Sequence, residues 1–135
     1  MEDKAVTDAA DAWIAYQKGV RESGEAFRTS PTAAALWPKY SQLLDWTYHD
    51  PELTWGTIVA IWNRINQDDL EALADLGAGE VEDLLNNFGE DYFPVIEKFC
   101  GVEPDFKTVL RMVWKSSMSP ELWQKVQDLR GGPNL

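Results

Sequence analysis

Apolar residues recur at intervals of three and four along most of this chain, and that spacing constrains its fold more than any other feature. The clearest case is the segment "HDPELTWGTIVAIWNRI", whose apolar face carries Trp55, Ile58, Val59, Trp62 and Ile65. Asp50 is placed to cap this helix, and Pro51 occupies its first position. No segment shows the alternation typical of a strand, so the sequence predicts an all-α fold.

Proline and glycine divide this pattern into seven to eight short helices. The first is predicted over residues 5–22, with its end near Gly24. A less ordered connection is expected to follow, before a second helix that starts around Pro38. The last helix is expected to begin at Ser119 and Pro120 and to end at Gly131 and Gly132, the first two residues of a loose tail over 131–135.

Short links between these helices favour antiparallel hairpins, arranged as a compact bundle or as a short α-solenoid-like stack. Three helix starts share one form, "DPEL" at 50, "EPDF" at 103 and "SPEL" at 119, but a capped proline start is too common to prove a repeat. The chain has 135 residues, which suits one helical domain spanning 1–135. Within it we expect an N-terminal helix and connection over 1–35 and a helical core over 36–130.

The segment "ADLGAGEVEDLL" holds a G-x-G at the entrance to a predicted helix. It lacks the further glycine, the preceding strand and the nearby lysine of a phosphate-binding loop. We therefore interpret it as a structural corner between two helices. Gly77 would end the first helix, Gly79 would permit a tight re-entry, and Glu82 would fold back on the backbone N–H groups of the corner.

Catalytic and metal-binding patterns are not recognisable. His49 is the only histidine and Cys100 the only cysteine, so a zinc site is not expected, and no motif surrounds a possible nucleophile. Cys100 lies in "VIEKFCGV", a setting typical of a small buried hydrophobic residue. We predict no catalytic residue and no cofactor.

Acidic residues give the strongest functional signal. The chain has 23 acidic and 12 basic residues, a balance that argues against direct binding to nucleic acid. Ten of the acids lie between Ile65 and Glu97, where there is no lysine or arginine. A helix would place Asp68, Glu71 and Asp75 in one stripe. The candidates for partner binding are Asp68, Asp69, Glu71, Asp75, Glu90 and Asp91, although a solvated helix face would give the same pattern.

A resemblance covers about residues 36 to 130. It rests on "LLDWTYHDPELTW", on "LADLGAGEVEDLLNNFGEDYF" and on the late "VLRMVW". In this order they resemble a small all-helical bacterial domain family of unknown function, with an L-G-A-G-x-[LV]-E-D-L-L-x-x-x-G motif. The resemblance implies the fold class and a bacterial origin, and it carries over no catalytic residue.

The sequence thus predicts an acidic, non-catalytic module that binds a basic protein. An immunity or antitoxin-type inhibitor of a basic toxin is the most specific form of this hypothesis. A small enzyme or ligand-binding domain with a Trp-lined pocket, or an accessory domain of unknown role, remains an alternative. The chain has no long apolar run and no apolar segment typical of a signal peptide, so a soluble cytoplasmic protein without membrane contact is expected.

Overall fold

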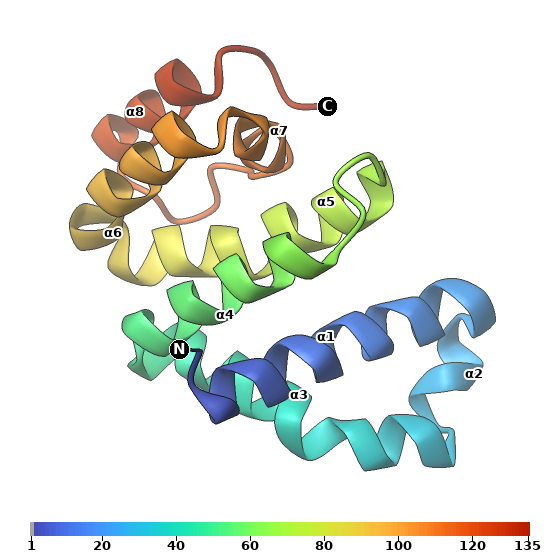
Figure 1. The fold of residues 1–135 in the computed structure, drawn as a ribbon. Coiled ribbons are helices and arrows are strands. Elements are labelled where there is room, and N and C mark those ends of the chain that lie inside the picture. The colour runs from blue at the N-terminus through green and yellow to red at the C-terminus, as the bar shows by residue number, and fades with distance from the viewer. Residues whose placement is uncertain (1) are drawn as a thin grey trace. The chain divides into compact units, whose positions relative to one another are not determined.

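The computed structural model describes residues 2–135, and every regular element within them is a helix (Figure 1). The predicted all-α class is therefore confirmed. The chain divides into two compact units, Met1–Ile65 and Asn66–Leu135, where the sequence predicted one domain. The predicted internal boundary near residue 35 does not coincide with the boundary between the units, because it falls inside a helix of the first one.

The first unit contains α1 (Lys4–Ser23), α2 (Glu25–Arg28), α3 (Pro31–His49) and α4 (Pro51–Arg64). Helix α1 packs against both α3 and α4. Its end at Gly24, where φ is 60°, agrees with the prediction. The core of the unit includes Trp13, Leu43, Ile58, Ile61 and Trp62, all of which are fully buried.

The start of α3 differs from the prediction. The connection that was expected after Gly24 contains α2, and α3 begins at Pro31 rather than near Pro38. The Ser30 side chain accepts a hydrogen bond from the Ala33 backbone N–H at 3.1 Å. Pro38 lies inside the helix, a position that costs a backbone hydrogen bond and usually marks a boundary. The Ser30–Pro31 pair therefore marks the start of α3 better than Pro38 does.

Helix α4 forms as predicted. The Asp50 carboxylate accepts the backbone N–H of Leu53 at 3.0 Å, and Pro51 occupies the first helical position, where its missing N–H costs nothing.

The second unit contains α5 (Leu70–Leu76), a π-helical segment η1 (Gly77–Val81), α6 (Glu82–Val102), a 3₁₀ turn η2 (Pro104–Phe106), α7 (Lys107–Leu110) and α8 (Pro120–Arg130). Helix α5, η1 and the first part of α6 form one continuous helical run, visible in Figure 1 between the labels α5 and α6. The run is interrupted at Phe88, where φ is −139° and ψ is 25°.

The predicted corner at Gly77 and Gly79 is wrong. Gly77 has right-handed helical angles, with φ at −68° and ψ at −50°, and the helix continues through both glycines. Gly77 is explained instead by close packing. A Cβ atom at this position would lie 2.7 Å from the Cβ of Met112 and closer still to the carbonyl oxygen of Val109. Nothing lies within 4 Å of a Cβ atom at Gly79, so the structure imposes no need for glycine there.

Glu82 also acts differently from the prediction. Its carboxylate does not fold back on a corner but accepts the backbone N–H of Trp114 at 2.8 Å. This bond ties the segment after α7 to the start of α6. Burial raises the pKa of Glu82, the hydrogen bond from Trp114 opposes that shift, and the charge of Asp83 adds to it.

Helix α6 changes direction next to Gly89. The break at Phe88 immediately precedes it, and the helix then continues to Val102. A Cβ atom at Gly89 would collide with the Leu122 side chain of α8. Glycine at this position therefore lets α8 approach α6 beside the break.

Helix α8 begins and ends as predicted. The Ser119 hydroxyl oxygen accepts the N–H of Leu122 at 3.1 Å, and Gly131 ends the helix in the left-handed conformation.

The tail 131–135 is not loose. The Leu135 N–H donates to the Arg111 carbonyl oxygen at 3.1 Å. The Asn134 side-chain amide donates to the same carbonyl at 3.1 Å and to the Val113 carbonyl at 2.7 Å. The tail thus donates hydrogen bonds to backbone carbonyl groups of the segment after α7. These carbonyls lie outside a helix, so they need such partners.

Candidate functional site

The six acidic candidates occupy two separate places in the second unit. Asp68 lies in the loop before α5, so it is not part of a helical stripe, and that element of the prediction is wrong. Glu71 and Asp75 do lie on α5, one turn apart. Glu90 and Asp91 follow the break in α6.

Asp69 caps the N-terminus of helix α5. Its carboxylate accepts the backbone N–H groups of Glu71 at 3.1 Å and Ala72 at 3.3 Å, as the N-cap of α5. A carboxylate in this position also interacts favourably with the helix dipole. The Asp69 carboxylate is therefore committed to capping α5.

Glu71 and Asp75 lie near the start of the helical run Leu70–Asn87, and Glu90 and Asp91 follow its end. At about 1.5 Å per residue the part of the run from Asp75 to Asn87 is about 18 Å long, more than twice the distance of about 8 Å over which exposed charges are screened in physiological salt. The six candidates therefore form two surfaces rather than one, and a pocket borders each surface.

The first pocket has a volume of about 520 Å³ and lies beside the start of α5. Its lining residues are Gln67, Asp68, Leu70, Leu73, Asp105 and Thr108. Two carboxylates from separate segments, Asp68 and Asp105, thus share it with two leucine side chains.

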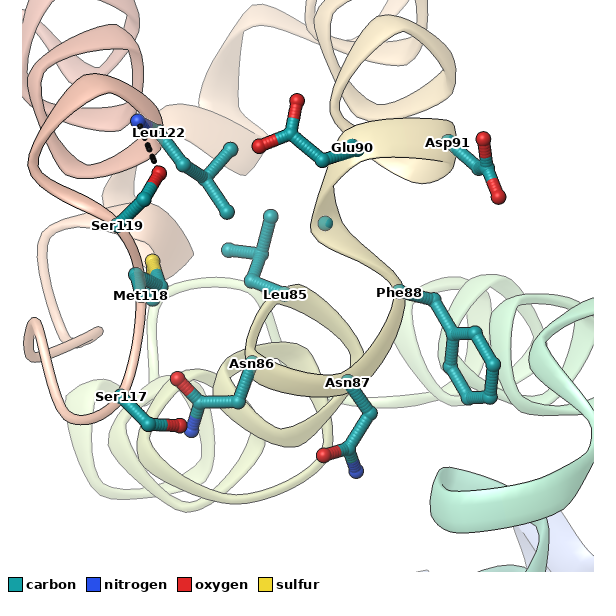
Figure 2. A pocket seen from close by; sticks show the side chains of 11 residues that line it. Leu85, Asn86, Asn87, Phe88, Glu90, Asp91, Ser117, Met118, Ser119 and Leu122 are labelled. Atoms are coloured by element: carbon teal, nitrogen blue, oxygen red, sulfur yellow. Dashed lines mark hydrogen bonds between the residues drawn. The ribbon is translucent and has the colours of Figure 1, made fainter.

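The second pocket lies at the break in α6 and has a volume of about 220 Å³; we call it the kink pocket. Residues from both sides of the break and from the segment before α8 line it: Leu85, Asn86, Asn87, Phe88, Gly89, Glu90, Asp91, Ser117, Met118, Ser119 and Leu122. Figure 2 shows the Glu90 side chain extending toward Leu122, and the Asn86 side chain extending toward Ser117. The Asp91 carboxylate points away from Leu122 and Ser117.

The polar lining of the kink pocket includes acceptors that lack a donor. The Asn86 side-chain oxygen is buried and accepts no hydrogen bond from residues 2–135. The Ser119 hydroxyl oxygen already accepts the N–H of Leu122. Within the same described range, the carboxylates of Glu90 and Asp91 have no basic side chain within ion-pair distance. A buried acceptor without a donor costs about 1–3 kcal/mol, so this pocket favours a ligand that donates.

A third pocket, of about 550 Å³, has balanced charges. It is lined by Phe93, Pro94, Glu97, Lys107, Lys125, Asp128 and Leu129. Since its two lysines face two acids, it does not select strongly for either sign of charge.

The residues considered for catalysis lie apart from these pockets. His49 is exposed at the end of α3, with its Nε2 atom 3.6 Å from an Asp45 carboxylate oxygen. Cys100 is buried, as the sequence indicated, and burial raises the pKa of its thiol to about 11. The thiol is therefore protonated at neutral pH and a poor nucleophile. No group of three or more potential ligands in residues 2–135 is placed to hold a metal ion.

The tryptophans considered as a pocket lining differ in their burial. Trp62 and Trp46 are buried, whereas Trp37 is 48% exposed and stacks on Tyr40 with ring centres 5.8 Å apart. None of the three pockets described above contains a tryptophan.

Sequence reasoning identified Glu90 and Asp91 but missed the polar residues that share their pocket. Asn86 precedes the break, and Ser117 lies about 30 residues further along the chain. Only the fold brings them together, and no local pattern in the sequence marks their proximity.

The fold and the pockets define an all-α protein with two separate acidic surfaces on one unit. A family model described as a family of unknown function (DUF6869) matches residues 28–133, and the chain belongs to that family. This confirms the resemblance to a family of unknown function. No curated protein matches the chain, and no solved structure matches it. None of the helices in residues 2–135 has the length and apolar character needed to cross a membrane.

Proposed function

We propose that this protein is a non-catalytic module that binds a basic protein through the acidic surface at the α6 kink. The observation that carries the proposal is the pair Glu90 and Asp91, two carboxylates without a basic neighbour, beside a pocket lined by acceptors. Uncompensated charge at a pocket favours a partner that supplies both positive charge and hydrogen-bond donors.

The charge of the whole chain supports this choice of partner. The formal net charge is −11, and the segment from Ile65 to Glu97 contributes ten acids without a base. Such a field accelerates the approach of a basic protein and repels nucleic acid phosphates. We therefore propose a protein partner and no direct contact with nucleic acid or membrane.

The most specific form of the proposal is an immunity or antitoxin-type inhibitor in the bacterial cytoplasm, which would cover the basic surface of a toxin. Small size and strong opposite charge suit that task, because fast capture matters more than catalytic machinery. This form further predicts that a toxin gene lies beside the gene for this protein.

The test compares two double substitutions with equal changes in net charge. Glu90→Lys with Asp91→Lys reverses the acidic pair at the kink, and Glu22→Lys with Asp45→Lys reverses two exposed acids of the first unit. A partner would be purified with the wild-type protein from lysate of the source organism, and association rates with each variant would then be measured.

We expect the kink variant to associate at least about tenfold more slowly, since both charges lie at the proposed contact. The control variant should remain close to wild type. If the two variants slow association equally, the kink surface is not the binding surface, and if neither does, charge does not govern recognition.

A further inference from the structure

We infer that the kink pocket receives the guanidinium group of a single arginine side chain from the basic partner. The inference rests on the proposed function, because it assumes a partner that carries positive charge. It adds the chemical identity of the group that enters the pocket and the residues that hold it.

Two acceptors from opposite sides of the α6 break define the site. The Asn86 side-chain oxygen is buried and lacks a donor, and the Glu90 carboxylate extends toward Leu122 without a basic partner in the described residues (Figure 2). Ser117 adds a hydroxyl group at the edge of the pocket. A ligand must therefore bring several N–H donors that point in different directions and a positive charge.

Arginine meets this requirement better than lysine. Its planar guanidinium group carries five N–H donors in a fixed arrangement. Two donors on one edge can therefore pair with a carboxylate while another donor reaches an amide oxygen. A lysine ammonium is a compact and strongly hydrated charge that gains less from acceptors spread around a pocket.

The size and the apolar part of the pocket agree with this assignment. Its volume of about 220 Å³ is large enough to admit a planar guanidinium group. Leu85, Met118 and Leu122 are buried residues that border the pocket and can contact the methylene groups of the arginine stem.

The first experiment titrates the full chain with N-acetyl-arginine amide and follows the backbone amide signals by NMR. Matched probes are N-acetyl-citrulline amide, which has nearly the same shape without the charge, and N-acetyl-lysine amide. We expect saturable shifts centred on Asn86, Glu90 and Ser117 with the arginine probe, and about tenfold weaker binding of the other two. Equal binding of citrulline or lysine, or no saturable shift at these signals, would overturn the inference.

The second experiment uses two variants that change the net charge equally. Glu90→Gln alters the carboxylate that extends toward Leu122, and Asp91→Asn alters the one that points away from it. We expect Glu90→Gln to weaken arginine binding about tenfold and Asp91→Asn to change it by less than about twofold. Asn86→Leu, confirmed as folded by circular dichroism, should weaken binding as Glu90→Gln does.

These results separate the inference from the proposed function. If Glu90→Gln and Asp91→Asn have equal effects, the acidic surface acts only through its charge, and the arginine pocket is refuted while the basic partner stands. If the arginine probe binds the pocket but the natural partner associates independently of charge, the proposed function fails while the pocket assignment stands.

Discussion

Gly77 and Gly79 give the sharpest test of how this fold is built, because they are two residues apart in one helical segment and have opposite surroundings. In Gly77→Ala the new methyl group would meet the Val109 carbonyl oxygen and, at 2.7 Å, the Cβ of Met112. Neither atom can move by a change of side-chain rotamer, so the segment that carries them must shift.

The expected magnitude follows from two opposing effects. Forcing a methyl group into a packed site costs about 1–3 kcal/mol, and the backbone contact at Gly77 places the cost at about 3 kcal/mol. Alanine regains about 1 kcal/mol because it favours the helix over glycine. Gly77→Ala should therefore lower the free energy of unfolding by about 2 kcal/mol, whereas Gly79→Ala, with nothing within 4 Å, should raise it by up to about 1 kcal/mol.

Urea denaturation followed by circular dichroism measures both free energies, and thermal melting should show a difference of about 3–5 °C per kcal/mol. The pair is its own control, since both variants make the same chemical change in the same segment. Equal stability of the two variants, or a loss at Gly79→Ala as large as that at Gly77→Ala, would refute the close-packing explanation.

Four further outcomes are expected. Cys100 should react very slowly with iodoacetamide at neutral pH in the folded protein and rapidly after unfolding, because it is buried and its thiol has a pKa of about 11. Glu82→Ala should be about 1 kcal/mol less stable in urea titrations than Glu82→Gln, which keeps an acceptor for the Trp114 N–H. Because folding raises the pKa of Glu82 above 4.5, the folded state takes up its proton first, so acidification toward that pH should stabilise the wild type relative to Glu82→Gln. Asn134→Ala should lower the free energy of unfolding in urea by about 1–2 kcal/mol, because it removes three side-chain hydrogen bonds that hold the tail, two to backbone carbonyls and one from Arg130.

The sequence predicted helix ends well where the end depends only on a capping residue or a glycine and not on contacts with distant parts of the chain. Asp50 and Ser119 form their expected caps, and Gly24 and Gly131 have the positive φ angles that end helices. These features depend on a few neighbouring residues, so a single sequence is enough to locate them.

Features that depend on distant contacts were not predictable in this way. Gly77 looks like a helix end, but its conformation is helical, and its reason lies in a segment about 30 residues further along the chain. The tail consists mostly of glycine and proline, which is typical of a loose end, and only the fold reveals that Asn134 donates to the carbonyl groups of Arg111 and Val113.

The candidate site was predictable in its charge and not in its shape. The excess of acids between Ile65 and Glu97 is a property of composition, and it pointed to Glu90 and Asp91. The break at Phe88 and the approach of the segment before α8 turn that charge into a pocket, and both arise from tertiary packing.

The dependence of the association rate on salt tests the central claim most directly. With the purified partner, association would be followed by stopped-flow fluorescence from low to high ionic strength, for the wild type and for the Glu90→Lys, Asp91→Lys variant. The account predicts a wild-type rate that falls steeply as salt screens the charges over about 8 Å, and a markedly shallower dependence for the variant. A wild-type rate that does not change with salt would contradict recognition through the acidic surface.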